Sequence, residues 1–222
     1  MPANLRLLSP PNGVDPKLFR PAVRSADGRP LVLTMARIHY IKGIEFLLRA
    51  AAIVRPKVPS VLFRVLGEPA NVEYFQRCQK FVVDHGLQGT VEFGSTKDPA
   101  SAYSEADVFC LPSVSEGMPY SILEAMFSGC AIVATDVGNV SEMLADTGLI
   151  VRPADPENLA EGLLSLLEGG EAAHQYRASL AKTALKRAHS LYTSDRSINR
   201  FRDLYQSLTY DRQISNLHTA AR

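Results

Sequence analysis

The feature of this sequence that most constrains its fold is a regular alternation of short apolar runs with amphipathic stretches. The apolar runs are mostly continuous in hydrophobic character, and several are rich in Val and Ile. This pattern is typical of strands that are buried on both faces of a parallel sheet. Six strands are predicted, at Leu31–Met35, Val61–Leu66, Val91–Phe93, Asp107–Leu111, Ala131–Thr135 and Gly148–Val151.

Helical patterns separate these runs. One apolar stripe has the spacing of a helix that lies on a sheet, and it comprises Ile44, Leu47, Leu48 and Ala51. A later stripe begins at Asp155-Pro156, a pair that suits the start of a helix. The alternation predicts a Rossmann-like, doubly wound α/β fold, with helices on both faces of a parallel sheet of about six strands. In such sheets ligands bind at the carboxyl ends of the strands.

The two ends of the chain follow a different pattern. From Glu171 to about Leu208 the sequence is helical in character and contains no further strand, so we expect C-terminal helices there. Residues 209–222 are expected to form a disordered tail. Residues 1–21 are expected to lead into one domain that spans residues 22–208.

Composition excludes several classes of protein. The 222 residues are 46% hydrophobic and 21% charged, which is ordinary for a globular domain, and the net charge of +1 argues against nucleic-acid binding. The three cysteines lack metal-ligand spacing, so neither a metal site nor a disulfide framework is expected, and a reducing cytoplasm is the natural setting. No apolar run could span a bilayer, although peripheral association with the inner face of a membrane stays open.

The strongest functional signal follows the fourth predicted strand, in a segment from Ser113 to Gly129. Its helix is expected to begin at Pro119, and backbone N–H groups at such a start can bind a phosphate. Glu116 and Glu124 can each accept hydrogen bonds from sugar hydroxyls. On spacing alone, however, the commoner interpretation is that both glutamates are solvated charges.

A resemblance to a known family makes the signal specific. The run Glu116-Gly-Met-Pro-Tyr-Ser-Ile-Leu-Glu124 closely resembles the Glu-x7-Glu motif of the family-4, or group 1, retaining glycosyltransferases, which have the B-type fold. Three further segments resemble this family in the right order. They are Pro11–Asp15 with Phe19–Pro21 (its hinge into the C-terminal domain), Arg37–Gly43 (its R-x4-K-G element), and Val137–Glu142 with Gly148–Pro156 (its closing section).

The resemblance implies a function and a set of site residues. The chain would be the C-terminal, donor-binding domain of a hexosyltransferase-like enzyme that retains anomeric configuration and needs neither metal nor other cofactor. Arg37 and Lys42 would contact the diphosphate of a nucleotide sugar and stabilise the charge of the leaving group. Glu116 would hold the donor sugar, and these three residues are the predicted catalytic groups. Glu124 would hold the ribose hydroxyls.

Further residues would line the donor. The backbone of the segment after Glu116 would border the sugar and the phosphates, and it comprises Gly117, Met118, Pro119, Tyr120 and Ser121. Gly94, Ser95 and Thr96, after the third strand, would lie beside the base. His39 is more consistent with a surface histidine than with a phosphate ligand.

The sequence also departs from the family. Members usually carry an N-terminal acceptor-binding domain ahead of the hinge, whereas here about ten residues precede it. We therefore expect either that this chain is a fragment or that the acceptor-binding domain is a separate chain. We also expect that the isolated chain is incomplete for turnover and that Tyr192–Leu208 exposes apolar surface. The alternative is a stand-alone module that binds a nucleotide or nucleotide sugar without turnover. A flavin or dinucleotide domain is disfavoured, because no G-x-G-x-x-G follows the first strand.

Overall fold

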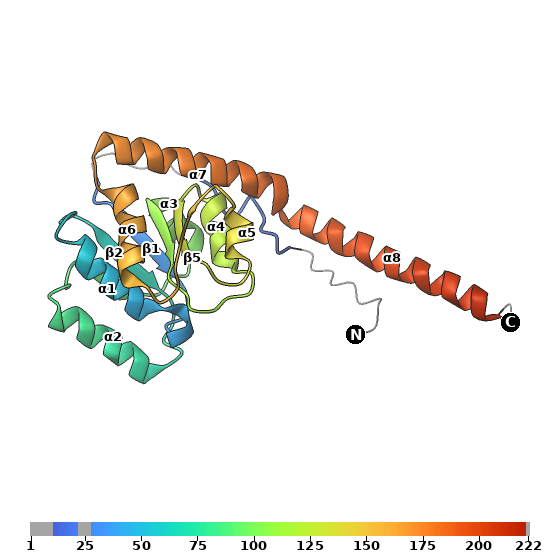
Figure 1. Cartoon of the computed structure of the whole chain (residues 1–222), viewed down its shortest axis with the longest axis horizontal. Coiled ribbons are helices and arrows are strands. Elements are labelled where there is room, and N and C mark those ends of the chain that lie inside the picture. Colours follow the sequence, from blue (N-terminus) through green and yellow to red (C-terminus); the bar gives the residue numbers. More distant parts are fainter. Residues whose placement is uncertain (1–10, 22–27, 221–222) are drawn as a thin grey trace.

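A six-stranded parallel sheet forms the centre of the molecule (Figure 1). The structure is a computed structural model that describes residues 11–21 and 28–220, with side chains described as far as Leu208. The strands are β1 (Leu31–Met35), β2 (Leu62–Leu66), β3 (Val91–Gly94), β4 (Val108–Leu111), β5 (Ala131–Thr135) and β6 (Leu149–Val151). All six lie at or within a residue of the positions predicted from the apolar runs, and the predicted fold class is confirmed.

The order of the strands places a crevice at the middle of the sheet. The order is β3-β2-β1-β4-β5-β6, and every neighbouring pair is parallel. The first three strands run outward from β1 to β3. The chain then returns to the middle of the sheet and places β4 beside β1, with Val32 opposite Val108. The loops that follow β1 and β4 therefore leave the sheet in opposite directions, and a ligand-binding crevice is expected between them.

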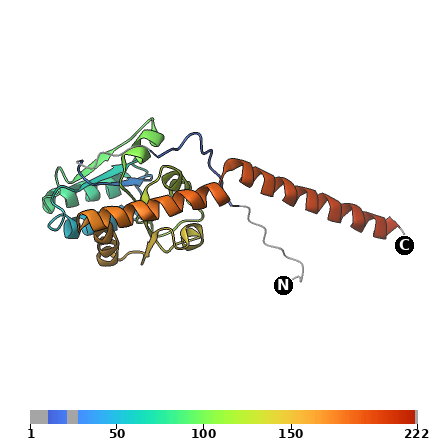
Figure 2. The same cartoon turned by 90° about the horizontal axis from the view of Figure 1, so that it is seen from above.

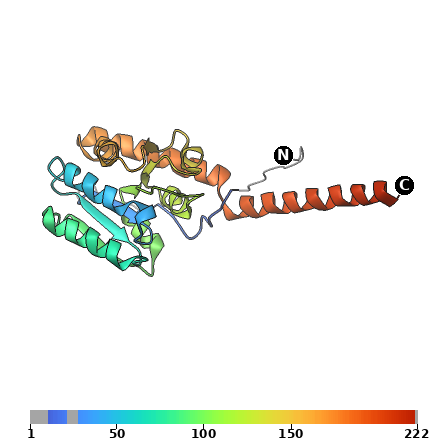
Figure 3. The same ribbon diagram turned by 60° about the horizontal axis from the view of Figure 1, so that its bottom comes forward.

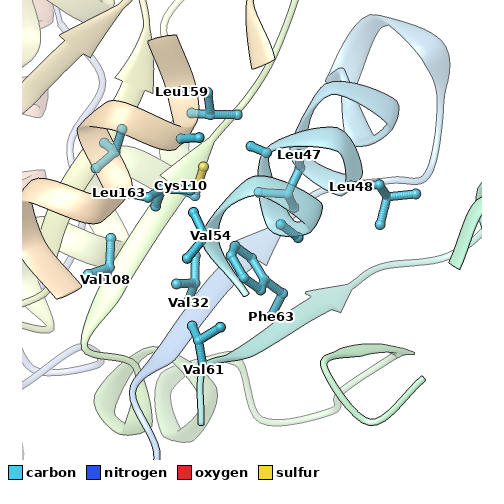
Figure 4. Packing of buried hydrophobic residues seen from close by; sticks show 14 of the residues in the cluster. Val32, Leu47, Leu48, Val54, Val61, Phe63, Val108, Cys110, Leu159 and Leu163 are labelled. Carbon is cyan, nitrogen blue, oxygen red and sulfur yellow. The ribbon is translucent and has the colours of Figure 1, made fainter. Parts of the chain in front are cut away.

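Helices cover both faces of this sheet. One face carries α1 (Ile44–Val54), α2 (Val72–Asp84) and α6 (Pro156–Leu167), and the other carries α3 (Pro99–Glu105), α4 (Tyr120–Phe127) and α5 (Val140–Leu144). The long helix α7 (Glu171–Leu191) contributes buried residues to both cores. Figure 4 shows the first of the two cores, in which Val54 of α1 lies next to Val32 of β1 and Leu163 of α6 lies beside Cys110 of β4. The apolar stripe predicted from Ile44 to Ala51 is fully buried in it.

All three cysteines are buried in these cores. Cys110 lies in the middle of β4 and is completely buried, which confirms its interpretation as a core thiol. Burial also raises the pKa of Cys78 to about 11, so that this thiol stays protonated at neutral pH.

The C-terminal helix α8 (Ser194–Ala220) extends away from the domain (Figures 1, 2 and 3). Its side chains Ile198, Phe201 and Leu208 are exposed, as expected for this region. Tyr192, which we expected to share that exposed surface, is instead buried in the second core with Val14, whose N–H donates to the Tyr192 carbonyl at 2.9 Å.

The helix also continues past Thr209, where we expected a disordered tail. Residues 209–220 contain neither Gly nor Pro, so no residue with a strong tendency to end a helix interrupts it. The remaining predicted boundaries, a leading segment of residues 1–21 and a domain starting at residue 22, fall partly on residues 1–10 and 22–27, which lie outside the described residues. Within the described part of the chain, no helix is long and apolar enough to cross a membrane.

Candidate functional site

The loops that follow β1 and β4 contact each other directly at the middle of the sheet. The backbone N–H of Val114, after β4, donates to the carbonyl of Ile41, after β1, at 2.8 Å. Gly43 adopts a left-handed conformation with φ of 63°, and a Cβ at this position would overlap the carbonyl oxygen of Pro112. The close approach of the two loops therefore requires glycine at residue 43.

This contact brings Lys42 and Glu116 together. The short 3-10 helix η1 (Tyr40–Lys42) ends in Lys42, whose Nζ lies 2.6 Å from Oε1 of Glu116. The hydroxyl of Ser113 donates to the same oxygen at 2.7 Å. The two side chains are only 19% and 10% exposed, so the ion pair is largely removed from water. Among the described residues, no further hydrogen bond occupies Oε2 of Glu116.

The loop after β5 supports the segment that follows Glu116. Gly138 has a φ of 54°, and a Cβ here would overlap the carbonyl oxygens of Glu116 and Gly117. The N–H of Asn139 donates to the carbonyl of Gly117 at 2.9 Å. Thr135, at the end of β5, donates to the carbonyl of Ser113 at 2.6 Å. Three loops at the carboxyl edge of the sheet thus fix the backbone around Glu116.

Helix α4 begins one residue later than predicted. Pro119 has an extended backbone and precedes the helix as its N-cap, so the first helical residue is Tyr120. Among the described residues, no side chain caps this helix end, and its first N–H groups therefore face the site without an intrahelical partner. The helix turns its buried face, with Ile122 and Met126, to the core, while Tyr120 is exposed.

Glu124 lies in α4 and is half-buried. Its Oε2 accepts a 2.7 Å hydrogen bond from the hydroxyl of Tyr103, which is completely buried in α3. Burial raises the pKa of the Glu124 carboxyl, and the bond from Tyr103 acts against that rise. The half-buried carboxylate is therefore held in one orientation by a neutral donor.

The end of β3 and the residue that follows it border a separate hollow. Gly94 and Ser95 line a cavity of about 190 Å³, together with Ile38 and the rings of Phe75 and Phe93. Thr96, which we expected beside the base with Gly94 and Ser95, is outside this lining and accepts a 3.0 Å hydrogen bond from the N–H of Asp98. Ile38 and Lys42 lie in the same loop after β1, so this loop contributes to both the hollow and the ion pair.

Arg37, unlike Lys42, does not pair with Glu116 in the described part of the chain. Its side chain is exposed, and among the described residues it forms no hydrogen bond or ion pair with the glutamates. His39 accepts a hydrogen bond from the N–H of Ile41 and packs against the ring of Tyr40. These contacts are local to η1 and are consistent with a surface histidine.

The described part of the hinge segment also reaches the site. The side-chain amide of Asn12 donates to the carbonyl of Met118 at 2.9 Å. Further along, the ring of Phe19 packs edge-on against Tyr103 with ring centres 5.8 Å apart. Met118 also lines a second hollow, of about 440 Å³, beside Arg187 and Tyr192.

Sequence reasoning did not single out several of these residues. Ser113 could have been found, because it is the first polar residue after β4 and precedes Glu116 by three positions. Asn12, Tyr103 and Gly138 reach the site from distant parts of the chain, and their roles depend on the order in which the strands pack. Local spacing contains no such information.

Comparison with known proteins assigns the family. A model of the family described as "Glycosyl transferases group 1" matches residues 29–169, which is more than half of the chain. The chain belongs to the group 1 glycosyltransferases. The matched region includes both loops of the ion pair and the whole of α4.

Curated relatives and solved structures agree with this assignment. The D-inositol 3-phosphate glycosyltransferase of Paenarthrobacter aurescens is 34% identical over 173 residues, which cover 71% of this chain and 42% of the relative. Sucrose-phosphate synthase from Thermosynechococcus elongatus superposes with a TM-score of 0.79 at 28% identity, over 91% of this chain and 52% of that one.

The place of the chain within the family follows from a third comparison. The C-terminal domain of the group 1 glycosyltransferase LpcC from Francisella tularensis matches along its whole length, with a TM-score of 0.74, 26% identity and 82% of this chain covered. This group 1 chain thus corresponds to a C-terminal domain of the B-type fold. It spans about half the length of the curated relatives it matches.

Proposed function

We propose that this group 1 domain binds the nucleoside-diphosphate sugar in a retaining, metal-independent glycosyl transfer. The observation that carries the proposal is the Lys42–Glu116 pair, which is largely buried at the strand switch point beside the uncapped start of α4. A cation and a set of N–H donors at one place favour an anionic ligand.

The diphosphate lies, in this proposal, at the start of α4 within reach of Lys42. The ammonium group and the N–H groups near Tyr120 and Ser121 stabilise the negative charge that grows on the phosphate as the sugar bond breaks. In this proposal, cations of the protein stabilise the charge on the phosphate, which is a role that a metal ion has in other enzymes. Arg37, which is exposed on the same loop, supplies a second cation at the rim.

The other parts of the donor fit around the diphosphate. Glu124 accepts hydrogen bonds from the ribose hydroxyls, and the hollow lined by Phe75, Phe93 and Gly94 receives the base. Glu116 keeps Oε2 for the hydroxyls of the donor sugar and stabilises positive character at its anomeric carbon. The backbone from Gly117 to Ser121 borders the sugar and the phosphates.

Transfer also requires a site for the acceptor. We propose that an acceptor-binding domain, in the same polypeptide or in a separate chain, packs beside this one and that the residues described here do not suffice for turnover. The relatives are about twice as long as the matched region, and the exposed apolar side chains of α8 offer a surface for such a partner. The proposed location is the cytoplasm, with peripheral contact at the inner face of the membrane.

A titration with nucleoside diphosphates tests the proposal. UDP, GDP and ADP would be compared by calorimetry and by thermal shift, with the matching nucleosides as controls that lack phosphates. One diphosphate is expected to bind and, at a hundredfold excess over its Kd, to stabilise the folded state by about 2.7 kcal/mol. Absence of binding by all three, or equal binding of the nucleosides, would contradict a diphosphate site at α4.

A further inference from the structure

We propose that Tyr103 is a positioning residue for the nucleotide, which fixes one carboxylate oxygen of Glu124 so that the other is presented to the ribose hydroxyls. This inference rests on the proposed function, since it concerns how the same site binds its donor. It adds a residue that lies outside the Glu116–Glu124 segment and reaches it from another helix.

The contact itself is specific. The Tyr103 hydroxyl donates to Oε2 of Glu124 at 2.7 Å, and the tyrosine is completely buried. Oε1 of Glu124 has no hydrogen-bond partner among the described residues, and it is not enclosed in the core. One oxygen is therefore used inside the protein, while the other is left for a ligand hydroxyl.

The tyrosine ring cannot easily move away from this contact. Phe109 of β4 packs against it with ring centres 5.5 Å apart, and Phe19 of the hinge segment packs edge-on at 5.8 Å. The Sγ of Cys130 donates to the Tyr103 carbonyl at 3.2 Å, which ties its backbone to the start of β5. The hydroxyl is thus held in place by the core and by the hinge at the same time.

Positioning of this kind strengthens binding in two ways. A glutamate side chain loses rotamer freedom when it grips a ligand, and a carboxylate that is already fixed loses less. A phenol donor also stabilises the ionised carboxylate, which alone can accept hydrogen bonds on both oxygens. Burial raises the pKa of Glu124, and the Tyr103 hydrogen bond counteracts this rise.

Few other charges act on the pair. The shift in the pKa of Glu124 has two causes, burial first and Tyr103 second. Tyr103 is affected in turn by burial, by Glu124 and by the thiol of Cys130, and its own pKa is raised so far that it stays a neutral donor. Among the described residues, no lysine or arginine pairs with the Glu124 carboxylate, and the described side-chain donor to it is the Tyr103 hydroxyl.

The test is the variant Tyr103→Phe, which keeps the ring and removes the hydroxyl. Affinity for the nucleoside diphosphate that the wild type binds is expected to fall roughly tenfold near neutral pH, the size of one lost hydrogen bond to a charged group. Because the pKa of Glu124 then rises further, affinity should also be lost at a higher pH as the solution is acidified. Titration of the phosphates is common to both proteins and cancels in the comparison.

Two further variants separate positioning from general stability. Tyr74→Phe removes another buried tyrosine hydroxyl, which accepts a 3.0 Å bond from the N–H of Glu45 in α1, and it should leave both affinity and pH profile unchanged. In a Glu124→Ala background, Tyr103→Phe should cause no further loss, because its effect passes through the Glu124 side chain.

The outcomes are distinguishable. If the wild type binds UDP, GDP or ADP while Tyr103→Phe binds with unchanged affinity and pH profile, the inference is wrong and the proposed function stands. A loss as large in Tyr74→Phe, or a full additional loss in the Glu124→Ala background, would also overturn it. If the wild type binds none of the three, the proposed function fails and the inference fails with it.

Discussion

Replacing Lys42 by alanine is expected to weaken nucleoside diphosphate binding roughly 10- to 150-fold, because one charge-assisted contact is worth about 1.5–3 kcal/mol. The same change should lower the free energy of unfolding by about 1–3 kcal/mol, since Glu116 is only 10% exposed and would keep Ser113 as its remaining described partner. Calorimetry and urea denaturation measure the two effects.

Two variants sharpen this prediction. Lys80→Ala removes a lysine from an ion pair with Asp84 that is well exposed to solvent, and it should change neither affinity nor stability by much. Lys42→Ala combined with Glu116→Gln removes both charges, so it should recover much of the stability while binding stays weak. Unchanged nucleotide affinity in Lys42→Ala would remove this residue from the diphosphate site.

The second large effect is expected at Gly43, where alanine should destabilise the domain by about 3 kcal/mol or more. Alanine in the left-handed conformation costs about 1–2 kcal/mol by itself, and the added Cβ would also collide with the carbonyl oxygen of Pro112. The loops after β1 and β4 would have to separate, which moves Lys42 away from Glu116. Urea denaturation should show the lower stability, and calorimetry the accompanying loss of nucleotide binding.

Gly89 provides the matched control. Its φ of 73° is close to that of Gly43, but a Cβ at Gly89 would meet no heavy atom within 4 Å. Gly89→Ala should therefore show the conformational cost alone, about 1–2 kcal/mol, with binding intact. If the two alanine variants were equally stable, the close contact between the loops would not be what requires glycine at residue 43.

Most of the fold could be predicted from the sequence because its elements are marked by local signals. The strands are continuous apolar runs, and α6 begins at the predicted Asp155-Pro156 pair, with Asp155 accepting a 2.8 Å bond from the N–H of Asn158. These signals do not include the strand order, which determines that β4 lies beside β1. The contact of Lys42 with Glu116, 74 positions apart, depends on that order.

The candidate site shows the same division. Glu116, Glu124 and Lys42 were found through their resemblance to a family motif, and the structure brings Lys42 to Glu116. Their roles in binding remain predictions. Tyr103 was missed because a lone tyrosine in a short helix resembles any core residue, and its role follows from a hydroxyl that meets Glu124 in space. Thr96 lies outside the lining of the hollow that Gly94 and Ser95 border, and its expected place beside the base stays a prediction.

The most direct test of the central claim is a crystal structure of this chain with the nucleoside diphosphate that it binds. We expect the diphosphate to contact Lys42 and the N–H groups at the start of α4, with a ribose hydroxyl hydrogen-bonded to Glu124. A nucleotide that lies at another edge of the sheet, in contact with neither Lys42 nor Glu124, would contradict the account.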